Sequence, residues 1–467
     1  MESGVERTAR DRPVVNPYSG ETIALVAEGD PADIDRAVAA ARRHLPPPPA
    51  AERAAVLDEA ARIVGDRSES LARTIALEAG KPLKQARGEV ARCRDTLTFA
   101  AAAARSLGGE VVPMEASSAG RGKVGIVVRA PRGVVGAISP FNFPLNLVAH
   151  KLAPAIAAGC PVVLKPAHQA PLSGLALAAI LVEAGLPPGY LTAVPGDGPT
   201  VGAALVEHPD VAVISFTGSG RVGWDIRARA PRKEVALELG NSTPAIVTAD
   251  ADLEHAAARL AASGFTHAGQ SCISVQRVYV ERPAHDEFLE LFRHAVDKLV
   301  VGDPLDEGTD VGPVIDEAAR DRVLAWIEEA RSGGAEVVTG GDLTGDGLIR
   351  PAVLVGISTD MKVSCEEVFG PVVGVAGFDT VDQAIDLANS TPFGLQAGIF
   401  TSRVDAAIGW AARLRFAGVT INETPTFRAD QMPYGGLKDS GNTREGPAYA
   451  VRTMTEEKLV IVEVPPG

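Results

Sequence analysis

The alternation of short apolar runs with helical segments after residue 133 is the feature that most constrains how this chain can fold. The segments between the runs carry apolar residues at three- and four-residue spacing. Such alternation is typical of a parallel sheet covered by helices on both faces. In this first region we expect helices at 145–158 and 173–184, and others from 199 and after 220. The expected strands are 133–138, 161–165, 191–194, 211–217 and 234–239.

A second alternating region follows and predicts a second α/β lobe. Its expected helices lie near 253–264, 284–299 and 381–388. Its expected strands are 244–247, 277–280, 370–375, 396–400 and 417–422.

The segments outside these two regions complete the expected architecture. Helical periodicity predicts helices at 32–43, 51–64 and 83–105. Two strands at 110–114 and 123–129, with glycines between them, predict a protruding hairpin, and the last apolar strand is 458–464. We therefore expect an α/β fold of two doubly wound lobes, with a small β element formed by the hairpin and the C-terminal strand.

Length and charge limit the classes of function. A chain of 467 residues is too long for one compact core and predicts two or three domains. Its formal charge of -14 and its aromatic content of 4% argue against a nucleic-acid partner. The four cysteines, Cys93, Cys160, Cys272 and Cys365, are far apart, so we expect neither a disulfide framework nor a metal site.

The sequence shows no targeting or membrane segment. Residues 1–13 are charged and contain no apolar core of a signal peptide. The most apolar region, 134–164, contains four prolines and Lys151, which argues against a membrane span. A cytoplasmic enzyme with no membrane partner is the resulting prediction.

The segment Phe216-Thr-Gly-Ser-Gly-Arg-Val-Gly223 follows an expected strand and opens a helix. Its glycines match a GxGxxG pattern, and a helix N-terminus with exposed amides suits a pyrophosphate. The alternative is a tight turn that only needs glycine, and the pattern alone does not decide between them.

Two further segments could serve a nucleotide. Lys165-Pro-Ala-His168 lies at the carboxyl end of an expected strand, where open α/β sheets bind ligands. Glu366-Glu-Val-Phe-Gly-Pro371 carries adjacent carboxylates before an apolar turn, and one of them could face a ribose diol. The alternatives are a surface lysine at a strand end and a solvated loop.

Gly269-Gln-Ser-Cys272 places a cysteine after a glycine turn. Nearby amide groups could lower the pKa of such a thiol and make it reactive. An isolated cysteine is more often a buried apolar residue, so its neighbours must decide. His150, His267 and His294 give no signal of a site.

Taken together and in order, these segments resemble the aldehyde dehydrogenase superfamily, in its NAD(P)-dependent, non-acylating branch, over essentially the whole chain. The matching stretches are Ser139-Pro-Phe-Asn-Phe-Pro-Leu145, Lys165-Pro166, Phe216-Thr-Gly-Ser219, Leu237-Glu-Leu-Gly240, Gly269-Gln-Ser-Cys272, Glu366-Glu-Val-Phe-Gly-Pro371 and Met432-Pro-Tyr-Gly-Gly-Leu-Lys438.

The resemblance implies oxidation of an aldehyde to a carboxylic acid. Cys272 would be the nucleophile, and the Asn142 amide with the Cys272 backbone N–H would stabilise the oxyanion. Glu238 would be the base that activates water to hydrolyse the thioester, and partial burial should raise its pKa. Without the family, the chemistry is also coherent, because a thiolate attacks well and leaves well but needs activated water to release the acid.

The resemblance also implies a nicotinamide dinucleotide cofactor. Lys165 and Glu367 would bind ribose hydroxyls, Phe369 would contact the nicotinamide, and the helix after Ser219 would hold the pyrophosphate. The full set of expected cofactor residues is Ser139, Pro140, Phe141, Lys165, His168, Gly198, Gly202, Phe216, Thr217, Gly218, Ser219, Leu239, Glu367 and Phe369.

Three positions depart from the family pattern. Asn241 stands where a second glycine is frequent, and Phe141 replaces a common tryptophan. His168 stands where many NAD-preferring members carry a glutamate, which would repel a 2′-phosphate. The resemblance therefore leaves NAD+ or NADP+ open, and family frequency favours NAD+.

Substrate contacts are expected at Arg428 and Phe143. Arg428 lies where the family places substrate-tunnel residues and could bind an anionic tail by a charge-assisted hydrogen bond. The alternative is an arginine paired with Asp430 or another structural acid.

The resemblance also implies how the chain divides and associates. Residues 1–109 and 131–239 would form the NAD(P)-binding domain, 240–440 the catalytic domain, and 110–130 with 453–467 an oligomerisation element. The unpaired edge of the last strand predicts a dimer or tetramer. The competing functions are a CoA-acylating relative, which generally lacks the glutamate at 238, and a non-catalytic protein of the same fold.

Overall fold

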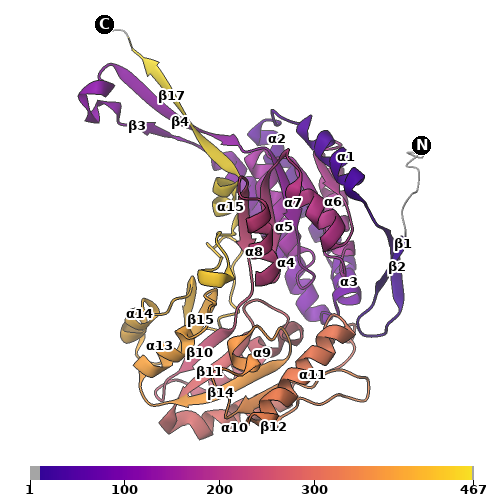
Figure 1. Ribbon diagram of the computed structural model, residues 1–467, viewed down its shortest axis with the longest axis vertical. Helices are drawn as coiled ribbons and strands as arrows, with labels where there is room; N and C mark the ends of the chain where they lie inside the picture. Colours follow the sequence, from indigo (N-terminus) through magenta and orange to yellow (C-terminus); the bar gives the residue numbers. More distant parts are fainter. Residues whose placement is uncertain (1–10, 465–467) are drawn as a thin grey trace.

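Residues 11–464 are described by a computed structural model, which has two lobes and a protruding arm (Figure 1). Expectations for residues 1–10 and 465–467 lie outside the described residues. Each lobe is a mostly parallel sheet with helices packed around it, so the expected α/β architecture is confirmed. No helix in residues 11–464 is long and apolar enough to cross a bilayer.

The first lobe contains a parallel five-stranded sheet in the order β7-β6-β5-β8-β9. Its strands are β5 (Val134–Ile138), β6 (Val162–Lys165), β7 (Leu191–Ala193), β8 (Val211–Thr217) and β9 (Glu234–Glu238). Its helices are α1 (Pro31–Arg42), α2 (Ala50–Asp66), α3 (Ser68–Ala79), α4 (Leu83–Ser106), α5 (Asn146–Ala158), α6 (Leu172–Glu183), α7 (Ala203–Glu207) and α8 (Gly220–Arg229).

The second lobe contains a seven-stranded sheet in the order β12-β13-β14-β11-β10-β15-β16, in which only β12 runs antiparallel to its neighbour. Its strands are β10 (Thr243–Val247), β11 (Val275–Glu281), β12 (Glu336–Thr339), β13 (Ala352–Val355), β14 (Val372–Phe378), β15 (Gln396–Phe400) and β16 (Gly418–Ile421). The helices after β9 are α9 (Leu253–Phe265), α10 (His285–Asp297), α11 (Glu317–Ser332), α12 (Lys362–Cys365), α13 (Val381–Asn389), α14 (Val404–Ala411) and α15 (Pro447–Thr453).

The arm is an antiparallel sheet of β3 (Glu110–Val112), β4 (Lys123–Pro131) and β17 (Thr455–Glu463) in the order β17-β4-β3. It projects away from both lobes (Figure 1). The strand at the C-terminal end pairs with β4 along its whole length, from Thr455 opposite Pro131 to Glu463 opposite Lys123. Residues from the two ends of the predicted β element therefore meet in one sheet.

Several elements were not predicted from the sequence. The hairpin of β1 (Asp11–Val15) and β2 (Thr22–Ala27) is short, and its apolar residues do not alternate with polar ones, so it gives no clear period-two signal. Helices α3 and α11, the edge strand β12 and its neighbour β13 were also missed. These elements cover the outside of the lobes, so their omission leaves the positions of the central strands unchanged.

Local chemistry explains where the central helix α5 begins and ends. Every residue of α5 is buried, and the helix ends at Gly159, whose φ of 83° places it in the left-handed region. At its start, Glu89 accepts hydrogen bonds from the amides of Leu145 (2.9 Å) and Asn146 (3.1 Å). The same carboxylate forms a fully buried ion pair with Lys81 of the preceding loop. Glu89 thus fixes the start of the helix that follows the Asn142 turn.

Replacing Glu89 with Ala should leave the Lys81 charge buried without its partner. Because breaking a buried ion pair costs about 3–5 kcal/mol, urea unfolding followed by circular dichroism should show a loss of that size. The matched control is Glu69→Ala, which removes an exposed pair with Arg87 and should cost less than about 1 kcal/mol. Equal losses in the two variants would contradict this role of Glu89.

Candidate active site

The cysteine loop before β11 is held in an unusual backbone conformation. His267, Ala268 and Gly269 have φ angles of 51°, 53° and 71°, a run of left-handed residues that costs energy at the two non-glycine positions. A Cβ on Gly269 would lie 2.1 Å from the carbonyl oxygen of Gly370, so only glycine fits there. This turn presents Cys272 to the junction of the two lobes.

Cys272 lies in a small apolar cluster with Ile273, Leu395 and Tyr434. Its Sγ is 2.8 Å from the Tyr434 hydroxyl. Burial raises the pKa of the Cys272 thiol to about 12, although the hydrogen bond to Tyr434 favours the thiolate. The thiol is therefore protonated at neutral pH in the free protein and needs a base when it reacts.

Asn142, in the turn after β5, reaches the cysteine loop from the other lobe. Its Nδ2 donates to the carbonyl oxygen of Gln270 at 2.8 Å, two residues before Cys272. The side chain is buried, and its second amide hydrogen is available to a further acceptor. The structure thus brings the expected oxyanion donor and the expected nucleophile together.

Glu238 is the last residue of β9 and is buried. Neither of its carboxylate oxygens has a hydrogen-bond partner within residues 11–464. Burial raises the pKa of Glu238 well above its usual value, and the nearby Glu445 raises it further. The Glu238 charge also raises the pKa of Cys272, which places the carboxylate and the thiol in one electrostatic environment.

A buried ionic group next to Glu238 was missed from the sequence. Lys151 of α5 lies 3.6 Å from Glu445, and its Nζ donates to the Thr217 hydroxyl at 2.6 Å. Burial opposes ionisation of Glu445, but Lys151 and Arg428 overcome it and lower its pKa to about 2. The signal for Lys151 was available, since it is the one charged residue in an otherwise apolar helix, whereas Glu445 has no local signal.

Arg428 is paired inside the protein. Its Nη2 donates to Glu445 at 2.9 Å, and its guanidinium lies 3.8 Å from the centre of the Tyr434 ring. The alternative of a structural acid as partner is therefore confirmed, and that acid is Glu445 and not Asp430. Asp430 instead accepts hydrogen bonds from Arg92 at 2.9 and 3.0 Å. Contact between Arg428 and a substrate anion stays a prediction.

Phe143, the second expected substrate residue, is surrounded by cations. Lys81 Nζ lies 3.6 Å from the centre of its ring and the Arg92 guanidinium 6.0 Å from it. His267 meets the ring edge-on at 6.4 Å. Both of these cations are paired with carboxylates, Lys81 with Glu89 and Arg92 with Asp430.

Lys165 and Glu367 fit a bound ribose. Lys165 ends β6, is buried, and donates only to the Pro166 carbonyl (3.2 Å) among the described residues. Burial lowers its pKa to about 8. Glu367 accepts from the Asn241 amide at 3.1 Å, and a Cβ on Gly240 would lie 2.4 Å from its carboxylate. A free ammonium group and an open carboxylate are groups that bind ribose hydroxyls.

The remaining expected cofactor residues lie on four neighbouring segments. Ser139, Pro140 and Phe141 follow β5, and the Phe141 ring meets Phe369 edge-on at 5.7 Å. Phe216 and Thr217 end β8, and Ser219 is the N-cap of α8 but makes no side-chain capping bond. Gly198 and Gly202 begin and end a π-helical turn. Leu239 packs on the Gly223 position, and Gly218 packs on the Phe216 ring.

His168 lies in the first lobe, in the loop that follows Lys165 at the end of β6. Its Nδ1 is 3.7 Å from Glu28, and its carbonyl accepts a hydrogen bond from Arg12 at 2.5 Å. Burial lowers its pKa, so the ring is neutral at pH 7. Arg12 and Lys165 therefore supply positive charge here, and Glu28 supplies the only carboxylate that we find within 4 Å of the His168 ring among the described residues.

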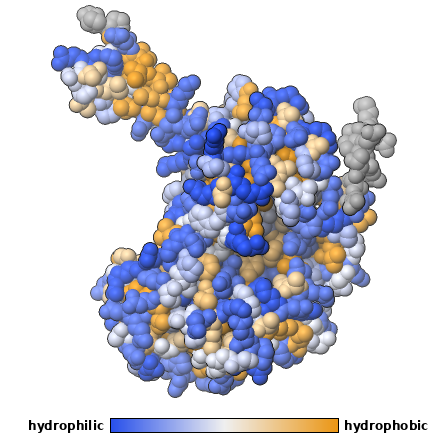
Figure 2. Space-filling model, viewed as in Figure 1, coloured by the Kyte–Doolittle hydropathy of each residue, from blue (hydrophilic) through white to orange (hydrophobic). Residues whose placement is uncertain are grey.

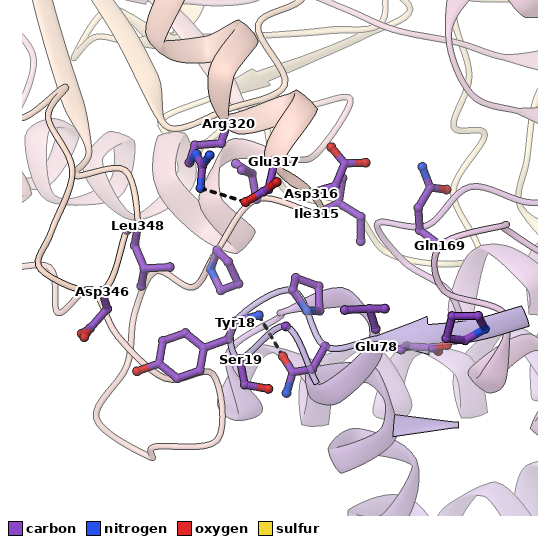
Figure 3. Close-up of a pocket in the computed structure, with 18 of the residues that line it drawn as sticks. Tyr18, Ser19, Glu78, Gln169, Ile315, Asp316, Glu317, Arg320, Asp346 and Leu348 are labelled. Atoms are coloured by element: carbon purple, nitrogen blue, oxygen red, sulfur yellow. Dashed lines mark hydrogen bonds and ion pairs between the residues drawn. The ribbon is translucent and has the colours of Figure 1, made fainter. Parts of the chain in front are cut away.

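A separate hollow of about 590 Å³ opens beside His168, between the β1–β2 hairpin and α11 (Figure 3). Tyr18 and Asp346 line one side and an ion pair between Arg320 and Glu317 lines the other. Cys272, Glu238 and Asn142 do not line it. The reacting groups therefore lie at the lobe junction and not in this hollow. No group of three metal-ligating side chains occurs in the described part of the chain.

Comparison with known proteins identifies the family. A sequence model of the aldehyde dehydrogenase family matches residues 5–460. The 3-sulfolactaldehyde dehydrogenase of Priestia aryabhattai is 43% identical over 460 residues, which cover 98% of this chain and 96% of that protein.

Two solved structures are similar along nearly the whole chain. Glyceraldehyde-3-phosphate dehydrogenase GapN from Methanocaldococcus jannaschii, complexed with NADP, has a TM-score of 0.93 and 38% identity, and covers 97% of this chain and 99% of that one. Betaine aldehyde dehydrogenase from Staphylococcus aureus, in complex with NAD+, has a TM-score of 0.94 and 33% identity, and covers 98% and 92%.

The chain belongs to the aldehyde dehydrogenase family. It is an NAD(P)-dependent oxidoreductase that oxidises an aldehyde to the carboxylic acid through a cysteine-bound thioester, as the resemblance implied. The prediction of a nicotinamide cofactor, either NAD or NADP, is confirmed.

Replacing His168 with Glu should weaken NADP+ binding selectively. A second carboxylate beside Glu28 repels a 2′-phosphate, so we expect the Kd for NADP+ to rise at least about tenfold, or about 1.4 kcal/mol. The Kd for NAD+ should stay within about threefold, and the neutral control His168→Gln should change neither. Binding is measured by quenching of tryptophan fluorescence. If the substitution raised the Kd for NAD+ and NADP+ equally, the 2′-phosphate would not lie beside His168.

Proposed function

We propose that Cys272, Glu238 and Asn142 carry out this oxidation, and that the substrate is a small aldehyde with an anionic tail. The observation that carries the proposal is the contact of Asn142 with the carbonyl of Gln270, which joins the amide of one lobe to the cysteine loop of the other. The unpartnered, buried Glu238 carboxylate supplies the base.

In the first step, Cys272 Sγ attacks the aldehyde carbon, the carbonyl π electrons move to oxygen, and the thiol proton leaves to a base. The Asn142 amide and the Cys272 backbone N–H donate to the oxyanion of the thiohemiacetal. Donors of this kind contribute roughly 10²–10³ in rate each. A bound nicotinamide cofactor would supply the hydride acceptor, and loss of hydride from this carbon would leave a thioester on Cys272.

In the second step, Glu238 takes a proton from water as the water oxygen attacks the thioester carbon. The carbon–sulfur bond then breaks, Cys272 leaves as the thiolate, and the acid is released. Because the base must be ionised, its raised pKa predicts that hydrolysis becomes faster as the pH rises through that pKa. Arg428 and Lys151 counteract the effect of burial by favouring the ionised form of Glu238.

We assign the cofactor contacts to Lys165 and Glu367 at the ribose, Phe369 at the nicotinamide and the start of α8 at the pyrophosphate. Their free donors and acceptors support this assignment. NAD+ remains the preferred cofactor in our proposal, since Glu28 introduces a carboxylate next to His168. A cytoplasmic location stays a prediction.

Each cation beside the substrate residues is paired with a carboxylate, so the unpartnered Nε of Arg428 is the group that supports an anionic tail. Arg92 and Lys81 flank Phe143, and Arg428 lies over the Tyr434 ring that contacts Cys272. Arg428 Nε is buried and has no partner in residues 11–464, so it can still donate a charge-assisted bond. The names of two relatives, for 3-sulfolactaldehyde and glyceraldehyde-3-phosphate, also denote anionic aldehydes.

The substrate proposal is tested with 3-sulfolactaldehyde and lactaldehyde, which differ only in the sulfonate. Wild-type protein should favour the sulfonate in kcat/KM. Arg428→Leu should reduce that preference by roughly 10–150-fold, the value of a hydrogen bond to a charged group of about 1.5–3 kcal/mol. It should also lower kcat for both aldehydes, because Glu445 loses its partner. A loss that is identical for the two aldehydes would contradict an anion contact at Arg428.

We also propose that the arm joins copies of the chain into a dimer or tetramer. The residues Leu459, Val460, Ile461 and Val462 are all exposed, so β17 presents apolar side chains on both faces. Figure 2 shows apolar residues gathered on the arm, while apolar and polar residues are mixed over the surface of the lobes. An exposed apolar edge strand is a surface that proteins normally cover.

Analytical ultracentrifugation tests the association. The double variant Leu459→Asp with Ile461→Asp should sediment as a smaller species than the wild type, because charges replace apolar side chains at the interface. The control Glu456→Lys changes an exposed polar residue of the same strand and should leave the assembly intact. A wild-type protein that sediments as a monomer would contradict the proposal.

A further inference from the structure

A small cavity lies behind the Glu238 carboxylate. Its lining includes His150 of α5, Ser215 of β8 and Glu445 as well as Glu238. The space open to the centre of a water molecule is about 10 Å³. A polar cavity needs roughly 10–15 Å³ of such space to hold one water. The cavity therefore has room for a single water molecule between ionisable side chains.

Two groups that line the cavity lack hydrogen-bond partners among residues 11–464. They are the Glu238 carboxylate, at both oxygens, and His150 at Nδ1. Both side chains are almost completely buried. Since buried polar groups are nearly always paired, a donor is expected for the carboxylate. The reaction described above gives no role to His150.

The other side of the His150 ring fixes its protonation. Nε2 lies 2.9 Å from Asp430. Asp430 is held by Arg92 and Asn146, and the hydrogen bond from His150 and the Arg92 charge lower its pKa despite burial. Burial lowers the pKa of His150, so its ring is neutral, with the proton on Nε2 facing Asp430. Nδ1, the other ring nitrogen of this cavity-lining residue, is then a buried acceptor without a partner in residues 11–464.

We propose that His150 and Asp430 hold one buried water against Glu238 and thereby keep this base ionised for thioester hydrolysis. The water donates one hydrogen to His150 Nδ1 and the other to the Glu238 carboxylate. A hydrogen bond to a carboxylate favours its charged form and lowers its pKa. His150 is a positioning residue in this arrangement, since it acts on the base through the water. The inference rests on the assignment of Glu238 as the base.

Other charged side chains also face Glu238 and His150 and influence their pKa values. Glu238 faces Glu445, which raises its pKa, and Arg428, Lys151 and Arg444, which lower it. His150 faces Arg428, Glu445 and Asp430. None of these charges changes when only the His150 side chain is replaced by a neutral amide, so a shift in pH profile can be assigned to the lost acceptor.

Two amide substitutions separate the two nitrogens of His150. His150→Asn keeps a polar atom near the Nδ1 position, at the cavity, and loses the contact with Asp430. His150→Gln keeps a polar atom near the Nε2 position, at Asp430, and loses the one at the cavity. A control, Thr96→Val, removes a hydroxyl that lies 3.3 Å from Nε2 and does not line the cavity.

The reaction is followed with p-nitrophenyl acetate, which acylates a nucleophilic cysteine without cofactor. The burst of p-nitrophenolate measures acylation of Cys272, and the slow phase measures hydrolysis by the base. The acid limb of the slow phase should shift up by about one pH unit in His150→Gln, a loss of about 1.4 kcal/mol. His150→Asn and Thr96→Val should stay within about 0.3 units of wild type.

A shift in His150→Asn that equals or exceeds the shift in His150→Gln would overturn the inference, because His150 would then act through Asp430 alone. Unchanged profiles in both variants would overturn it as well. The burst amplitude shows that each variant is folded and reactive. Release of p-nitrophenolate that is unchanged in Cys272→Ala would instead contradict the assignment of Cys272, so the two failures are distinguishable.

Discussion

The site depends on one hydrogen bond between the lobes, from Asn142 Nδ2 to the Gln270 carbonyl. Asn142 is held in place by the start of α5, which the buried Glu89 fixes, and Gln270 by a left-handed turn that only Gly269 can complete. Neither lobe contains both the proposed nucleophile, Cys272, and the proposed oxyanion donor, Asn142. The geometry of reaction is therefore a property of the lobe junction, and it is preorganised before any substrate enters.

Because Glu238 is buried, its ionisation depends on the charged side chains around it. A single buried carboxylate would stay protonated, and a second one at Glu445 makes ionisation harder. Lys151 and Arg428 offset both effects by pairing with Glu445 and by acting on Glu238 across a short distance. Arg428 thus links the base to the ring that contacts Cys272, and the proposed anion contact would connect substrate binding to the ionisation of the base.

The sequence predicted the central strands well, because these carry strong local signals, and it placed the proposed site residues at their ends. Strands buried on both faces are continuous apolar runs, and Lys165 and Glu238 end such runs. The ionic group of Lys151, Glu445 and Arg428 could not be predicted, since its members are far apart in the chain and meet only through the fold. The partner of Arg428 was left open for the same reason. The β1–β2 hairpin was missed because its strands are short and their apolar residues do not alternate with polar ones.

The most direct test of the account uses Glu238→Gln with an aldehyde and NAD+ or NADP+, followed by mass spectrometry of the intact protein and of its Cys272 peptide. If Cys272 forms the thioester and Glu238 only hydrolyses it, one equivalent of reduced cofactor should form rapidly, and the acyl mass should remain on Cys272. Steady turnover at the wild-type rate with no adduct on Cys272 would contradict the account.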